Sequence, residues 1–201
     1  ITEMGQPLGC TVGNSLEVRE AIAVLSGNAE RSTDLKELTL ELATEMLVLS
    51  GLSESHPHGL RLARQALDSG KALERLGELI EAQGGNPRII DNIDLLPQSP
   101  HTTVVTAPHE GWVACIDARL IGAATVALGA GRAQRSDSLD PAAGIELHAK
   151  CGQWVSRDEP WATLYHGPGA DLGRATMKLK AALSISPDKP TAIHLVKERR
   201  P

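Results

Sequence analysis

Aromatic residues are almost absent from this sequence of 201 residues, which has no Phe, one Tyr and three Trp. Proteins that bind single-stranded nucleic acids stack the bases on aromatic side chains, so this composition argues against that class. Basic residues are not clustered either. The first hundred residues carry 15 acidic and 8 basic side chains, and the remainder carries 10 acidic and 12 basic side chains. We therefore expect no nucleic-acid partner, and we expect a core of Leu, Ile, Val and Ala.

Long apolar runs are absent too. No stretch approaches the roughly 18 apolar residues of a membrane-spanning helix, so we expect no membrane partner. The start, ITEMGQPLG, has no charged segment followed by an apolar one, and it predicts no targeting signal. Three cysteines are too few and too scattered for a disulfide framework or a zinc cage, which favours a cytoplasmic protein. Because the first nine residues are typical of a strand end and a loop, we expect the chain to be the later portion of a longer protein.

The first half of the sequence predicts four helices. The first, over residues 15–26, has Asn14 as its expected N-cap and Glu17 three residues later, as in a capping box. The second has Asp34 as its expected cap, and its apolar residues recur at helical spacing on more than one face. The third begins at Pro57 and the fourth ends at Gly84. Residues 87–100, which are punctuated by Pro, are interpreted as a connection between domains.

The second half changes to short strands separated by turns, with two helices among them. A helix is expected at residues 120–128 and an amphipathic one at residues 171–184. The expected strands cover residues 102–106, 111–116, 145–147, 154–155, 161–165 and 192–196. The fold class is therefore predicted as α+β, with a helical segment over residues 1–98 and a second domain over residues 99–201.

Most patterns that could carry chemistry have a simpler structural explanation. His56 and His58 flank Pro57 and could bind a metal, but no further ligand has suitable spacing, so a surface helix cap is favoured. The glycines of residues 129–131 are interpreted as a helix C-cap rather than an anion site. Cys10 has no neighbouring histidine to activate it. Lys150 lies in a segment that resembles the hairpin of biotinyl or lipoyl carriers, but it occupies a different turn, which argues against its modification.

The segment QPLGCTVGNSLEVRE, residues 6–20, is the most informative. Its Pro-Leu-Gly turn leaves backbone carbonyls outside any regular ladder. Glu17 and Glu20 lie one and two turns into the following helix. Carbonyl and carboxylate oxygens are the ligands that alkali and alkaline-earth ions prefer, so the segment could hold such a cation. The alternative is a solvated helix with a tight entry loop, and spacing alone leaves both open.

Long stretches of the sequence resemble the thymidine phosphorylase and pyrimidine-nucleoside phosphorylase family. The first is EMGQPLGCTVGNSLEVREAI, which is similar to the segment before a long helix in that family. The others, in order, are DLKELTLELATEMLVLSG, GKALERLGELIEAQGG, APHEGWVACIDARLIGAATVALGAGR and KCGQWVSRDEPWATLYHG. The resemblance covers essentially all 201 residues and implies the C-terminal half of such a protein.

The resemblance implies both a fold and an activity. The fold is a helical segment, part of the family's α and α/β domains, followed by a C-terminal α/β domain with a hammerhead-like barrel-sandwich module. Family members are homodimers that cleave a pyrimidine nucleoside with phosphate as co-substrate, giving free base and (deoxy)ribose 1-phosphate. Their catalytic residues lie in the N-terminal half, so none is expected here, and the chain alone is expected to be inactive.

One site carries over by resemblance. Bacterial pyrimidine-nucleoside phosphorylases can bind potassium through two loop carbonyls and a glutamate, which match Leu8, Thr11 and Glu20. Two alternative functions remain open. One is a non-catalytic carrier-like or interaction module, and the other is a nucleoside-monophosphate phosphorylase, against which the asparagine of VGNSLEV argues.

Overall fold

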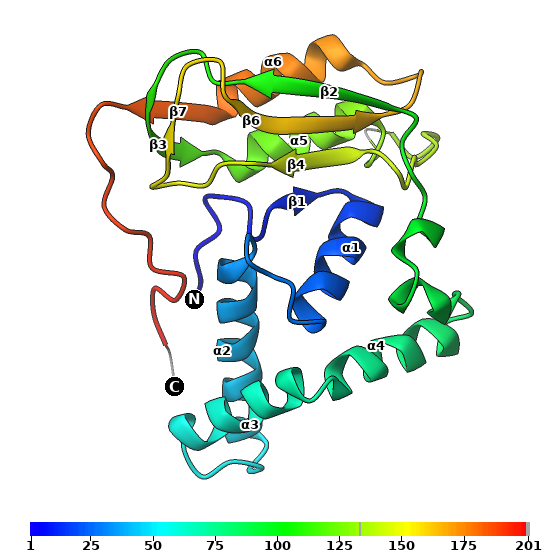
Figure 1. Cartoon of the computed structure of the whole chain (residues 1–201), viewed down its shortest axis with the longest axis vertical. Helices are drawn as coiled ribbons and strands as arrows, with labels where there is room; N and C mark the ends of the chain where they lie inside the picture. Colours follow the sequence, from blue (N-terminus) through cyan, green and yellow to red (C-terminus); the bar gives the residue numbers. More distant parts are fainter. Residues whose placement is uncertain (133, 200–201) are drawn as a thin grey trace. The chain divides into compact units, whose positions relative to one another are not determined.

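The computed structural model describes residues 1–132 and 134–199, and the chain divides into two compact units (Figure 1). One unit contains residues 1–18 together with the described residues from Pro97 onward, and the other contains Arg19–Leu96. This division differs from the predicted one at the N-terminus, because residues 1–18 belong with the second half of the chain. The reason is strand pairing between positions more than 130 residues apart, which no local pattern indicates.

The first unit contains two antiparallel sheets. The order is β1-β4-β6-β2 in the four-stranded sheet and β5-β3-β7 in the three-stranded sheet. Two helices accompany them. The elements are β1 (Thr11–Val12), β2 (His101–Thr106), β3 (Gly111–Ile116), α5 (Ala118–Leu128), β4 (Gly144–Leu147), β5 (Trp154–Val155), β6 (Pro160–His166), α6 (Leu172–Ala182) and β7 (Leu183–Ser186).

The core of this unit lies where the strands meet α5 and α6, which pack against each other. Its side chains are aliphatic, as the scarcity of aromatic residues predicts, apart from the fully buried Trp161. The largest of the others are Ile116, Ile121, Leu128, Ile145, Leu147, Leu164 and Leu179. The prediction of an α+β fold is confirmed by these mixed elements and antiparallel sheets.

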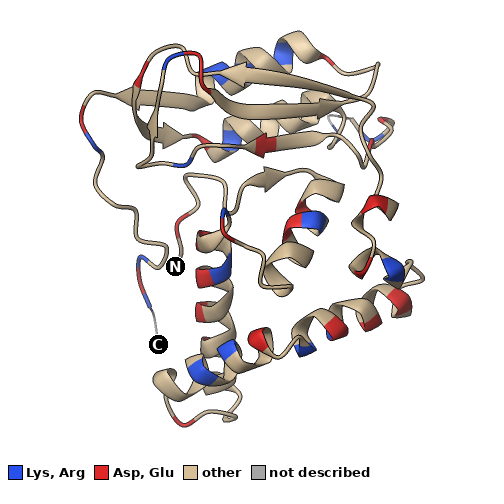
Figure 2. Cartoon of the chain, in the orientation of Figure 1, with Lys and Arg blue, Asp and Glu red and all other residues tan. Residues whose placement is uncertain are grey.

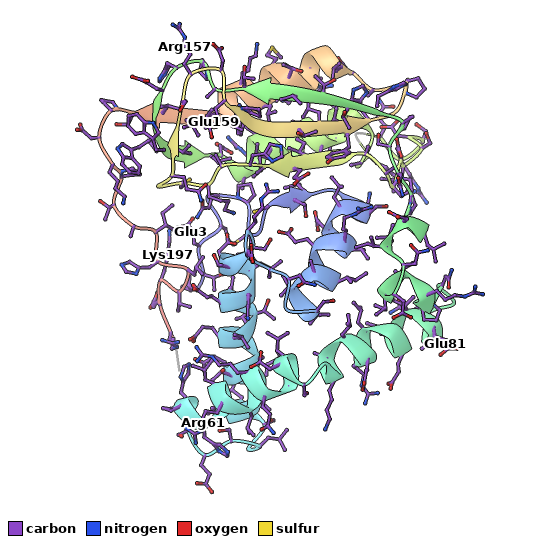
Figure 3. All side chains as sticks on the ribbon, viewed as in Figure 1. Glu3, Arg61, Glu81, Arg157, Glu159 and Lys197 are labelled. Carbon is purple, nitrogen blue, oxygen red and sulfur yellow. The ribbon has the colours of Figure 1, made fainter. Side chains whose placement is uncertain are left out.

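The end of the chain differs from the prediction. The last helix ends at Ala182, and Leu183–Ser186 then pairs with β3 as strand β7. The predicted strand over residues 192–196 is wrong, since only an isolated bridge joins Val196 to Thr2. Nearby, Lys197 forms an ion pair with Glu3, whose labels lie together in Figure 3. That contact and the Gly5 N–H hold the pKa of Glu3 below its usual value.

The second unit is helical. Helix α1 begins in the first unit and continues into this one, α2 packs on α3, and α3 contacts α4. The region predicted as a plain connection contains two short 3₁₀ helices. The elements are α1 (Asn14–Leu25), α2 (Thr33–Leu49), α3 (His56–Asp68), α4 (Lys71–Ala82), η1 (Pro87–Ile90) and η2 (Ile93–Leu95).

The caps of the first two helices differ from those predicted. The Glu17 carboxylate accepts from the Gly13 N–H at 2.9 Å, and the Gly13 carbonyl accepts the first helical bond. The cap of α1 therefore lies one residue before Asn14, whose side chain instead donates to the Ala130 carbonyl at 3.0 Å. Helix α2 is capped by Ser32 rather than Asp34, and no side-chain cap bond is made there.

Charged residues are spread along the helices of the second unit. Acidic side chains recur along α2 and α4, with basic ones between them (Figure 2). Within the described part of the chain, no helix combines the length and apolar character needed to cross a membrane.

Candidate functional site

The loop before α1 is held tightly against strand β4. The Leu147 N–H donates to the Cys10 carbonyl at 2.7 Å, and β1 then pairs with β4 through Thr11 opposite Glu146. At Gly13, whose φ is 141°, an added Cβ would lie 2.6 Å from the Ala143 carbonyl oxygen. A side chain would not fit there, so glycine is required for the loop to approach β4 this closely.

Lys150 clamps the same loop from the turn that follows β4. Its ammonium donates to the Pro7 carbonyl at 2.6 Å and to the Gly9 carbonyl at 2.5 Å. These two carbonyls flank Leu8 in the sequence. Charge-assisted bonds of this kind are among the stronger hydrogen bonds in proteins. The loop that carries the predicted cation ligands therefore has a defined conformation, fixed by a residue about 140 positions away.

The two predicted carbonyl ligands, Leu8 and Thr11, are next in sequence to the residues whose carbonyls make these bonds. Among the described residues, no hydrogen bond reaches the Leu8 carbonyl. Thr11 follows the Cys10 carbonyl that bonds to β4, and it lies opposite Glu146 in edge strand β1. Both residues thus lie in a loop in which the neighbouring Pro7, Gly9 and Cys10 carbonyls accept hydrogen bonds.

Glu20 is a buried carboxylate in the second unit. Only 8% of the residue is exposed, and its Oε1 accepts a hydrogen bond from the Ser32 hydroxyl. A carboxylate is costly to bury unless hydrogen bonds or a cation compensate it. The alternative of a solvated Glu20 on an exposed helix face is therefore wrong. Ser32 uses its hydroxyl for Glu20, which explains why it does not cap α2 with that group.

The other candidate residues have mixed outcomes. Gly129 ends α5 in the left-handed conformation with its N–H bonded to helix carbonyls, which confirms the predicted C-cap. Cys10 is buried. His56 is the first residue of α3 and not its cap, which is Ser55, and its imidazole contacts Glu41.

Sequence reasoning missed the role of Lys150. The lysine was considered only as a site of covalent modification, whereas its ammonium binds loop carbonyls at the other end of the chain. No local pattern signals this contact, because the pairing of β1 with β4 is what brings Lys150 near a loop about 140 residues earlier in the sequence. Glu41 was likewise missed as a partner of His56, although its spacing from Glu45 already places the two on one helix face.

Comparisons with known proteins agree with the resemblance seen in the sequence. A family model described as the pyrimidine nucleoside phosphorylase C-terminal domain matches residues 112–186. Curated relatives named pyrimidine-nucleoside phosphorylase, from Staphylococcus aureus, match 98% of the chain. The relative from strain bovine RF122 / ET3-1 is 37% identical over 198 residues, and those from strains USA300 and NCTC 8325 / PS 47 are 36% identical.

The chain spans 45% of the length of these relatives. The match includes the helical unit and the loop before α1 as well as the region of the domain model, since 98% of the chain is aligned. The chain is therefore similar, over 98% of its length, to the C-terminal half of pyrimidine-nucleoside phosphorylases, and residues 112–186 match the C-terminal domain of that family.

Proposed function

We propose that this chain is the C-terminal half of an enzyme that catalyses reversible phosphorolysis of pyrimidine nucleosides, thymidine among them. The products are the free base and (deoxy)ribose 1-phosphate. The observation that carries the proposal is the 36–37% identity to pyrimidine-nucleoside phosphorylases over 98% of the chain. This identity extends across both compact units, beyond the region that matches the C-terminal domain model.

In this reaction a phosphate oxygen attacks the anomeric carbon while the N-glycosidic bond breaks and its electron pair leaves with the base. Such a site must position the anion and stabilise the developing charge with preorganised donors. We place those donors in the N-terminal half of the protein. The chain described here is therefore proposed to contribute structure and a cation site but no catalytic residue, and to be inactive alone.

The test compares the 201-residue chain with the longer protein that contains it. We expect phosphate-dependent release of thymine or uracil from the longer protein and none from the chain alone. Each missing donor of this kind is commonly worth about a hundredfold or more in rate. Base release by the pure chain would contradict its inactivity, whereas an inactive longer protein would contradict the proposed function. The same assay with a nucleoside monophosphate tests the alternative of a nucleoside-monophosphate phosphorylase, which would release the base from that substrate instead.

We also propose that Leu8, Thr11 and Glu20 are ligands of a potassium ion. The donors fit this ion, because two carbonyl oxygens and a carboxylate are hard oxygen ligands. Support comes from the Leu8 carbonyl, which accepts no hydrogen bond among the described residues, and from the buried Glu20 carboxylate. In this proposal Lys150 holds the loop in place, and the potassium ion balances the negative charge of the Glu20 carboxylate.

A carrier-like function has less support. A carrier presents its modified lysine to solvent at a hairpin tip, whereas the Lys150 ammonium binds two backbone carbonyls. We further propose a cytoplasmic homodimer and a hammerhead-like barrel-sandwich arrangement of the β-rich unit. The dimer is supported by Leu42, Met46 and Leu49, which form an exposed apolar stripe along one face of α2.

A further inference from the structure

A second cluster of possible ligands lies within the helical unit. Glu41 and Glu45 occupy adjacent turns on one face of α2, and His56 is the first residue of α3. The His56 Nε2 lies 3.0 Å from a carboxylate oxygen of Glu41 and 4.0 Å from one of Glu45. One ligand atom from each of the three lies within 4.8 Å of the others. Helices α2 and α3 thus bring three side chains that can bind a metal ion close together.

The scaffold that holds these groups is closely packed. Gly59, one turn into α3, faces Thr44 of α2 so closely that an added Cβ would lie 3.2 Å from its side chain and 3.3 Å from its carbonyl oxygen. Thr44 is fully buried. The turn between the helices is also fixed, because the Ser53 N–H donates to the Leu47 carbonyl and its hydroxyl to the Ser55 carbonyl. The cluster is therefore positioned by a glycine-mediated helix contact next to it.

The chemistry of the three groups is that of a transition-metal site. Two carboxylates balance the charge of a divalent ion, and an imidazole shifts the preference from Mg²⁺ or Ca²⁺ toward ions such as Zn²⁺. Three protein ligands leave a coordination position for water. The side chains of His56, Glu41 and Glu45 are 37%, 30% and 38% exposed, so an ion can reach them from solvent.

We propose that Glu41, Glu45 and His56 form a binding site for a divalent transition-metal ion of the Zn²⁺ type, which joins α2 to α3. Binding replaces the direct His56–Glu41 contact by two metal–ligand bonds, and any proton shared in that contact is released to solvent. The site lies entirely within one compact unit and does not depend on the proposed phosphorolysis. The bound ion should stabilise the folded unit, because its three ligands come together only when α2 and α3 are packed.

The test is a titration of the full chain with Zn²⁺ by isothermal calorimetry. We expect one ion per chain, and a loss of affinity of roughly tenfold or more in Glu45→Gln and in His56→Ala, since each removes one of only three ligands. His58→Ala is the matched control, because His58 lies two residues away on the same helix and outside the cluster. It should bind as the wild-type chain does.

Two further measurements complete the test. Zn²⁺ should raise the melting temperature of the wild-type chain and of His58→Ala, but not that of Glu45→Gln. With Co²⁺ as probe, the absorption spectrum should lack a thiolate charge-transfer band, which separates this site from the three cysteines. Three results would each overturn the proposal. They are an equal loss of Zn²⁺ affinity in His56→Ala and His58→Ala, a thiolate band in the Co²⁺ spectrum, or no stoichiometric Zn²⁺ binding. Glu45→Gln is nearly isosteric, so circular dichroism should verify its native fold.

Discussion

At the scale of single residues, two glutamates of helix α1 lie in surroundings that the sequence does not indicate. Glu20 was open to interpretation as a solvated helix residue, yet it is buried with a hydroxyl partner. Glu17, one turn earlier in the same helix, instead accepts a hydrogen bond from the Gly13 N–H at the helix start. Two glutamates one turn apart therefore have unrelated roles, which differ in both burial and hydrogen-bond partner.

The proposed cation predicts a salt-specific stability. Potassium should raise the melting temperature of the wild-type chain more than equimolar lithium does, because a small, strongly hydrated ion loses more solvation in a site of carbonyls. Glu20→Gln keeps the shape and removes the charge, so it should erase that difference. Thermal melts in the two salts measure the effect. Identical curves for both ions in the wild-type chain would contradict the potassium site.

The cysteines provide a second residue-scale prediction. Burial raises the pKa of the Cys151 thiol above its ordinary value, and Cys115 is exposed. Because the thiolate is the reactive form, Cys115 should react with iodoacetamide well before Cys151 at neutral pH. Mass spectrometry of peptides over a labelling time course measures the order. Faster labelling of Cys151 would show that its surroundings are more open than the structure indicates.

At the scale of elements, the loop from Pro7 to Gly9 depends on Lys150. Lys150→Met keeps most of the aliphatic chain but removes the ammonium, so the Pro7 and Gly9 carbonyls lose this hydrogen-bond donor. We expect a loss of about 1–3 kcal/mol in the free energy of unfolding. Lys180→Met on α6 is the matched control, since Lys180 is exposed, and it should change stability by less than about 0.5 kcal/mol. Urea unfolding of both variants measures the difference.

If Lys150 acts only on the loop, hydrogen exchange should increase selectively there. The amides of residues 8–13 and their partners in β4 should lose protection in Lys150→Met, while those of α5 and α6 retain it. A uniform increase over the whole unit would instead indicate that Lys150 supports the core.

At the scale of the whole molecule, the exposed stripe on α2 predicts self-association. Leu42, Met46 and Leu49 recur at helical spacing and are 49%, 65% and 84% exposed in the single chain. Contiguous apolar surface of this kind typically marks an interface. Sedimentation should show a dimer that Met46→Lys weakens. Met177→Lys on α6, which alters a similarly exposed methionine in the other unit, should leave the dimer intact. A wild-type monomer at high concentration would contradict the proposed dimer.

The sequence by itself determined the helices and most strands, because amphipathic periodicity and glycine or proline at the ends are local signals. Helices α2, α3 and α4 and strands β3 and β5 lie where those patterns indicate. The family resemblance was also readable, since it rests on contiguous stretches. The caps of α1 and α2 were not determined by the sequence. Ser32, Asp34 and Asn14 are all good capping residues, but in the fold their side chains hydrogen-bond to other groups.

Only the tertiary structure decided which distant segments meet. The pairing of β1 with β4 carried residues 1–18 into the β-rich unit and brought Lys150 to the Pro7 and Gly9 carbonyls. Leu183–Ser186 became a strand through its partner β3, and residues 192–196 did not. The close packing of α2 on α3 placed Glu41 and Glu45 beside His56. Each of these contacts depends on long-range packing energy that adjacent residues do not encode, which is why local periodicity predicted the elements but not their sites.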